Sequence, residues 1–461
     1  MYPNPQEVIP LPPNPNLDQY KKQAKDLVKA CQSGDRNAVH AWAAVWLATL
    51  ARLHNSAREP GLPEWIHRQV DQVAGFAQEK LLPPDAHGAL AAAQFLIART
   101  HGFLSWPKFA KHIEALARAS SPISNFESAA DAIVSGEVSR LERLLREDPE
   151  LIRARSTREH GAALLHYVSA NGVEGYRQKT PKNAVQVAEI LLNAGAEVEA
   201  EADVYGGGAT TLGLVATSIH PFLAGLQNPL IQILLDHGAR IDHPESAGNR
   251  HSAVIGCLAN GRGEAAVYLA ERGARLGLAA AAGVGRLDIV KSYFKEESAS
   301  SETGSDVVQV STASDRAAVS TGSSSDRARH LQGAAPHQLQ AGFSWACEYG
   351  RKDVVEFLLD QAVDLCSGEN TPQTALHLAA HQGQLEIIKL LLARGAPLEA
   401  KNVYGGTVLG QATWSVMHGD PKVDFVPTIE ALLAAGANIE GAAYPTGNAR
   451  VDKVLRRHGA K

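Results

Sequence analysis

A repeat of 33 residues is the feature that most constrains how this 461-residue chain can fold. Gly350 and Gly383 are 33 residues apart, and Thr374 and Thr407 have the same spacing. A structural repeat of this length buries its apolar surface only against its neighbours. The chain is therefore predicted to form a stacked array of similar units instead of one globular core.

The most regular repeat, 374–406, predicts two helices followed by a hairpin. Thr374 can cap the first helix by accepting a hydrogen bond from an unpaired backbone N–H, and Gly383 ends that helix. The second helix carries a stripe of leucines that includes Leu391, and Gly395 supplies the left-handed backbone that ends it. The polar, Gly-rich residues that follow predict a hairpin leading to the next repeat.

This segment resembles the consensus of the ankyrin-repeat family. The first helix follows the family motif T-P-L-H-x-A-A, except that Ala375 replaces the proline. The matching residues are Thr374, Leu376, His377, Ala379 and Ala380. The resemblance implies an all-α, ankyrin-repeat α-solenoid with β-hairpin fingers, in which His377 forms a hydrogen bond between repeats.

Weaker copies of the repeat extend over two blocks, 127–294 and 342–461, and we count about eight units followed by a C-terminal cap. Three units lengthen the connection between their two helices, at 173–184, 219–228 and 416–427. Insertions in solenoids usually project from one face, which is often the binding face. A binding role and neutral decoration both remain open for these three insertions.

Residues outside the array divide into three segments. Residues 295–341 include a Ser/Thr-rich stretch with few large apolar side chains, which predicts a disordered insertion. Residues 1–15 are expected to be flexible, and residues 16–120 have a helical pattern without the repeat. The helices expected there run from near Asn16 to Gly34, from Ala89 to Arg99 and from Trp106 to Leu116. This segment resembles the N-terminal helical extension of many bacterial ankyrin-repeat proteins, and we expect it to cap the first repeat.

Composition excludes several classes of partner. A net charge of −5 without dense clusters of Arg and Lys argues against nucleic-acid binding. The longest apolar run, Ala41–Leu50, is about half as long as a membrane-spanning helix needs to be. The four cysteines are scattered without a CxxC pair, which favours a reducing compartment. We therefore expect a cytoplasmic monomer with no nucleic-acid or membrane partner.

No motif of catalysis, metal binding or cofactor binding is complete. His377 and His381 have the i, i+4 spacing of zinc ligands, but the glutamate of the metalloprotease motif is missing. The glycines at 283–288 and 204–208 lack the other residues of dinucleotide-binding and phosphate-binding loops. No pair of carboxylates stands in an apolar context where a raised pKa would mark a general acid. The sequence thus predicts no enzyme activity, no cofactor and no metal.

The ankyrin resemblance implies a protein-interaction module or scaffold that binds through hairpin tips and the inner face of the first helices. Tyr404 and Trp414 stand out because large amphipathic rings at exposed positions are favoured interface anchors. Trp414 could instead pack under the loop at 416–427, and Tyr404 could have a structural role shared with Tyr205. The candidate partner-binding residues are Glu348, Tyr349, Asn370, Thr371, Gln373, His381, Gln382, Val403, Tyr404, Trp414, Ser415 and Tyr205.

An alternative function is a small-ligand-binding or enzymatic domain within 16–120 that the repeat array targets. A deep polar pocket among those helices would favour this alternative. A closely packed apolar interior against the first repeat would exclude it.

Overall fold

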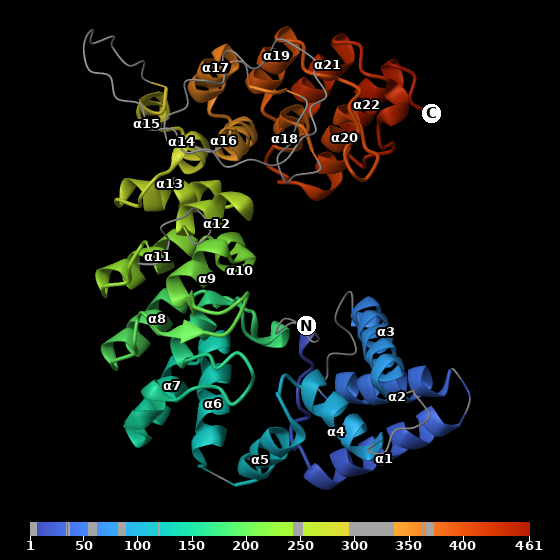
Figure 1. The fold of residues 1–461 in the computed structure, drawn as a ribbon, viewed down its shortest axis with the longest axis vertical. Helices are drawn as coiled ribbons and strands as arrows, with labels where there is room; N and C mark the ends of the chain where they lie inside the picture. Colours follow the sequence, from blue (N-terminus) through green and yellow to red (C-terminus); the bar gives the residue numbers. More distant parts are fainter. Residues whose placement is uncertain are drawn as a thin grey trace, which may run out of the picture. The chain divides into compact units, whose positions relative to one another are not determined.

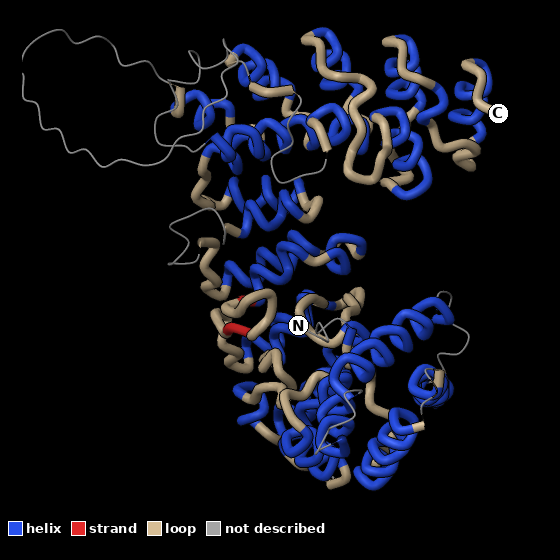
Figure 2. Tube along the Cα trace, turned by 45° about the vertical axis from the view of Figure 1, so that its right-hand side comes forward, coloured by secondary structure: helices blue, strands red, loops and turns tan. Residues whose placement is uncertain are grey.

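The computed structural model describes residues 7–33, 35, 37–53, 62–81, 89–118, 120–242, 252–294, 336–361, 363–365 and 373–461. The chain divides into two compact units, Met1–His243 and Pro244–Lys461. Both units are mostly helical, which confirms the predicted all-α fold class (Figure 2). Within the described residues, the one small sheet pairs β1 (Glu201–Ala202) with β2 (Ala209–Thr210) in an antiparallel hairpin.

Unit 1 begins with five helices that do not belong to the repeat. They are α1 (Leu17–Gln32), α2 (Ala38–Leu53), α3 (Leu62–Leu81), α4 (Ala89–Thr100) and α5 (Trp106–Leu116). The Asn16 side chain caps α1 by accepting from the Asp18 N–H at 2.8 Å. The predictions for α1, α4 and α5 are confirmed to within two residues. Helices α2 and α3 were not predicted, and the apolar run at 41–50 belongs to α2.

Helix pairs of the repeat follow in unit 1. The elements are α6 (Pro122–Ser135), α7 (Val138–Glu147), η3 (Pro149–Arg153), η4 (Leu164–Ser169), η5 (Gly175–Arg177), α8 (Ala184–Asn193), α9 (Thr211–Thr217), α10 (Ile219–Leu223) and α11 (Gln227–Asp236). The first helix of the second repeat, η4, is a 3₁₀ helix and not the expected α-helix. The insertion at 219–228 is largely helical, because it contains α10 and the start of α11.

Unit 2 continues the repeat in a more regular form. Its helices are α12 (Ala253–Ala259), α13 (Gly263–Glu271), α14 (Leu278–Val284), α15 (Leu287–Ser292), α16 (Pro336–Glu348), α17 (Lys352–Asp360), α18 (Ala375–His381), α19 (Leu385–Ala393), α20 (Val408–His418), α21 (Val426–Ala434) and the terminal α22 (Ala449–Arg457). First helices α16, α18 and α20 form one row, and second helices α17, α19 and α21 form the other (Figure 1). Helix α16 begins six residues before the predicted block at 342, and the rest of the predicted Ser/Thr-rich insertion, 295–335, lies outside the described residues.

The most regular repeat folds as its sequence predicts. The Thr374 hydroxyl caps α18 by accepting from the His377 N–H. Leu391 is fully buried on α19, and Gly395 after this helix has φ +81°. The His377 ring donates through Nε2 to the Gly406 carbonyl at 3.2 Å, which is the inter-repeat hydrogen bond that the resemblance implied.

No helix among the described residues is long and apolar enough to cross a membrane.

Candidate protein-binding surface

The exposed large apolar side chains of unit 2, within its described residues, all belong to one repeat. They are Val403, Tyr404, Trp414 and Met417, with exposed fractions of 67%, 83%, 45% and 40%. The first two residues lie in the hairpin before α20, and the other two lie one turn apart on α20. We call these four residues the aromatic face.

Asn402 holds the hairpin that presents Val403 and Tyr404. Its side-chain oxygen accepts from the backbone N–H groups of Tyr404 at 3.0 Å and Gly406 at 2.9 Å. Gly405 has φ +79°, a conformation that a side chain would strain. The turn is therefore fixed by buried Asn402, and both apolar side chains point outward.

Trp414 lies between two histidines on the surface of unit 2. Its ring stacks on the ring of His418, with centroids 4.5 Å apart. The ring centroid of His381, on the neighbouring helix α18, lies 5.9 Å from that of Trp414. The first three residues of the insertion at 416–427 continue α20 as a helix. Almost half of the Trp414 side chain remains exposed, so its ring is available to a partner.

A hydrogen-bond network underlies this surface. His381 Nδ1 accepts from the hydroxyl of Ser415 at 2.7 Å and from the amide of Gln411 at 3.2 Å. The Gln373 amide in turn donates to Gln411 Oε1 at 3.1 Å. The expectation that Ser415 is exposed is wrong, because its side chain is only 1% exposed and turns inward to His381. Burial lowers the pKa of His381, which favours its neutral form.

The remaining candidates of unit 2 are half-buried or undescribed. The Tyr349 hydroxyl donates to the Leu258 carbonyl, and its ring packs beside Gly263. Burial raises the pKa of Glu348 to about 7, although a hydrogen bond from Gln382 opposes this shift. These three side chains are engaged within the protein. Asn370 and Thr371 lie outside the described residues.

Unit 1 carries a group of exposed apolar side chains at the corresponding places of its third repeat. This counterpart face consists of Tyr205 in the hairpin and Ile219, Phe222 and Leu223 on α10. Tyr205 differs from Tyr404, because its hydroxyl donates to Asn171 Oδ1 at 2.7 Å and its φ is +54°. The two hairpins share a sequence but use their tyrosines differently.

A set of charged side chains that the sequence did not reveal lies inside unit 1. This buried ion cluster consists of Glu127 on α6, Arg158 after η3, and Glu174 and Arg177 from the insertion at 173–184. Arg158 Nε lies 2.9 Å from Glu174, and Arg177 Nη1 lies 2.8 Å from Glu127. The expectation that this insertion projects from a face is wrong for its first half, because Glu174 is fully buried and Arg177 is 4% exposed.

The electrostatics of the cluster favour full ionisation. Burial alone would raise the pKa of Glu127, but Arg158 and Arg177 outweigh it and hold that pKa at about 2. The same two arginines hold the pKa of Glu174 well below its usual range against the effect of burial. The two arginines keep both carboxylates charged, and neither has the raised pKa that would mark a general acid.

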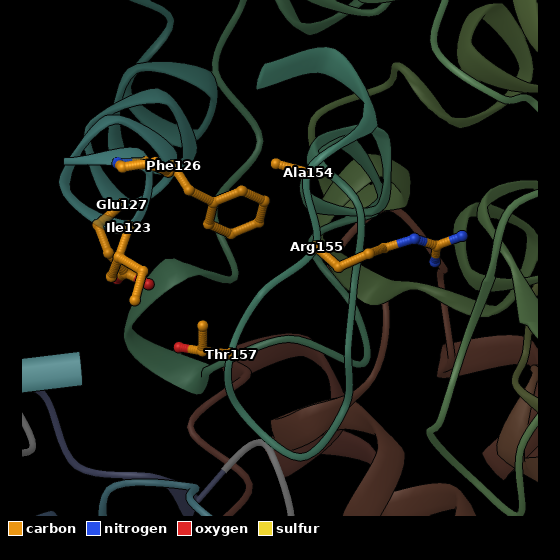
Figure 3. Close-up of a pocket in the computed structure, with 7 residues that line it drawn as sticks. Ile123, Phe126, Glu127, Ala154, Arg155 and Thr157 are labelled. Carbon is orange, nitrogen blue, oxygen red and sulfur yellow. The ribbon is translucent and has the colours of Figure 1, made fainter. Parts of the chain in front are cut away.

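A small pocket borders this cluster on the side of α6. Its volume is about 80 Å³, against roughly 300–1,000 Å³ for typical ligand pockets. Phe126 reaches toward the loop that carries Ala154, while the Arg155 guanidinium points away from it (Figure 3). Arg155 is engaged elsewhere, because its Nη1 donates to the Glu201 carbonyl at 2.6 Å. The pocket is too small for a typical substrate.

His377 and His381 do not share a ligand position, because they contact Gly406 and Ser415 respectively. The described parts of the chain contain no group of three or more His, Cys, Asp or Glu side chains arranged to hold a metal ion.

The match to a family model agrees with the repeat geometry. Residues 316–441 match the family model of ankyrin repeats in three copies. One similar solved structure is the human ASB11 ankyrin repeat domain, with a TM-score of 0.32 and 20% identity, covering 67% of this chain and 98% of that chain. A search of curated proteins found no match.

The stacked helix pairs and their connecting hairpins define an α-solenoid. Residues 316–441 match the ankyrin-repeat family, and the 33-residue period of the sequence agrees with that match. Ankyrin repeats are generally protein–protein interaction modules.

Proposed function

We propose that this chain binds another protein through the aromatic face and has no catalytic activity of its own. The observation that supports the proposal is the concentration of exposed Val403, Tyr404, Trp414 and Met417 in one repeat. Single apolar side chains scattered over a protein surface are ordinary, whereas several of them in one repeat point to an interaction site. Tyrosine and tryptophan are also the residues that contribute most to interface energy.

The counterpart face supports a scaffold function. Tyr205, Ile219, Phe222 and Leu223 offer unit 1 an apolar surface of the same kind. One chain with two such faces can hold two partners or two parts of one partner.

Residues 16–120 act in this proposal as the cap of the first repeat. Their interior is an apolar core. Helices α4 and α5 each contact the loop after η3 through a polar side chain. Arg99 pairs with Glu159, and Thr157 lies 2.7 Å from His112 Nδ1. The free state of Cys31, Cys257 and Cys347 is compatible with a reducing cytoplasm, and the bacterial resemblance of the N-terminal segment suggests a bacterial one.

Site-specific photocrosslinking tests the proposal. A photoreactive phenylalanine analogue replaces Tyr404 in one variant and the exposed Glu430 on outer helix α21 in a matched control. We expect the first variant to capture a protein that the control does not capture. The captured protein, once purified, should bind the wild-type chain and bind Trp414→Ala more weakly. Equal capture at both positions, or equal affinity for both chains, would count against the aromatic face.

A further inference from the structure

Helices α1–α4 enclose a set of buried polar side chains that lack partners. Tyr20 on α1, Trp46 on α2, Gln69 on α3 and His101 directly after α4 are between 0% and 4% exposed. The Tyr20 hydroxyl, Trp46 Nε1, His101 Nε2 and both amide atoms of Gln69 have no hydrogen-bond partner in the described part of the chain. Helices α1, α2 and α3 thus carry one such side chain each, and the fourth follows α4 directly.

Three of these side chains meet directly. The rings of Tyr20 and Trp46 approach the His101 ring edge-on, with centroid distances of 5.3 Å and 5.7 Å. Gln69 belongs to the buried face of α3, next to Val70 and Val73 of the same core. The three rings therefore meet in the core to which the buried face of α3 also belongs.

The hydrogen-bonding roles of the set can be assigned. His101 Nδ1 donates to the Ile9 carbonyl at 3.1 Å, which leaves Nε2 as an acceptor. Burial lowers the pKa of His101 to about 3, so the ring is neutral, and burial raises the pKa of Tyr20, so its hydroxyl keeps its proton. Trp46 Nε1 is a donor only, and Gln69 offers both a donor and an acceptor. The set combines donors with acceptors and carries no charge.

Native proteins pair nearly all of their buried polar groups, and a group of unpaired ones needs a physical explanation. We propose that the centre of the α1–α4 bundle binds a small, neutral, hydrogen-bonding molecule between Tyr20, Trp46, Gln69 and His101. Such a molecule accepts from Trp46 and donates to His101. The core around these side chains is closely packed and buried, so the molecule is of the size of water or a neutral amide of a few atoms.

Substitutions in the full-length chain test this site. Whether they lower or raise the melting temperature depends on whether a molecule is bound there. Tyr20→Phe and Gln69→Leu keep the shape of each side chain and remove its polar atoms. If a molecule pairs with these atoms, each variant should lower the melting temperature of unit 1 by about 2–4 °C. If the atoms are unpaired, their removal should leave the melting temperature unchanged or raise it. Tyr404→Phe, at an exposed tyrosine, is the matched control and should have no effect.

Two further measurements identify the molecule. Native protein is denatured, and the released small molecules are quantified by mass spectrometry, while a crystal structure at about 1.5 Å shows the bundle core. A neutral compound released at one equivalent per chain identifies a cellular ligand. Density for water between the four side chains, without a released compound, identifies water. Both results support the site, whereas an empty core together with unchanged or raised melting temperatures would overturn it.

Discussion

The Nε atom of Arg158 lies 2.9 Å from the carboxylate of Glu174, and the two side chains are only 1% and 0% exposed. Glu127 and Arg177 complete this buried ion cluster. The cluster joins α6, the loop after η3 and the insertion at 173–184 inside unit 1. A buried charge costs several kcal/mol unless it is paired, so the cluster is stable only when it is complete.

We predict that Arg158→Met lowers the free energy of unfolding of unit 1 by about 3–5 kcal/mol, because it leaves Glu174 as an incompletely paired buried charge. Urea unfolding followed by circular dichroism measures this loss. Arg140→Met is the control, since Arg140 pairs with exposed Glu137 on the surface and should contribute at most about 1 kcal/mol. Adding Glu174→Leu to Arg158→Met should recover part of the loss. Equal effects of the two arginine variants would show that the cluster does not hold unit 1 together.

We predict that acid destabilises unit 1 in two stages. Burial lowers the pKa of His112 from 6.5 to about 4. Between pH 6.5 and 4, the unfolded chain therefore binds a proton at this histidine that the folded chain does not bind. Stability therefore falls as the pH drops from about 6.5 toward 4. Glu127, with its pKa lowered from 4.5 to about 2, extends the loss below pH 4.5 for the same reason.

Melting temperatures measured from pH 7 to pH 3 check this dependence. His112→Phe should make the decline between pH 6.5 and 4 less steep, while buried His101 and His166, whose pKa values are also lowered, sustain the rest of it. His237→Asn, at an exposed histidine, should leave the decline unchanged. A decline that is as steep in His112→Phe as in the wild type would assign the acid sensitivity to other groups.

Local spacing allowed much of the fold to be predicted from the sequence. Thr374, Gly383 and Gly395 mark helix ends through capping and backbone preferences that act over a few residues. The same rules located α1, α4 and α5. They failed at η4, where the repeat pattern indicated an α-helix. The chain forms a short 3₁₀ helix there and then enters the insertion that contains η5.

The buried ion cluster could not be predicted, because its members are far apart in the sequence. Glu127 and Glu174 come from different repeats, and each stands in an ordinary polar context. An insertion that contains charged residues together with Gly and Pro is typical of a solvent-exposed loop. Only tertiary packing brings the residues together, as it also turns Ser415 inward toward His381.

We predict that Leu391→Ala costs about 2–5 kcal/mol of stability, the usual range for truncating a fully buried leucine. Lys389→Ala on the exposed side of the same helix should change stability by no more than about 0.5 kcal/mol. Urea unfolding of both variants measures the difference. Similar values for the two would mean that α19 buries a different face.

We predict that the two hairpin tyrosines differ in their contribution to stability. Tyr205→Ala should cost about 1 kcal/mol or more, because it removes the hydrogen bond to Asn171. Tyr404→Ala should be close to neutral, because 83% of its side chain is exposed. Thermal melts of both variants test this difference. Equal destabilisation would indicate that Tyr404 also has a structural role.

Isothermal titration of the purified partner against wild-type and Tyr404→Ala chains tests most directly whether the aromatic face binds protein. If Tyr404 anchors the partner, its removal should cost about 2 kcal/mol, a loss of roughly 30-fold in affinity. The melting temperature should remain that of the wild type. Unchanged affinity of a fully folded Tyr404→Ala chain would contradict the proposed binding surface.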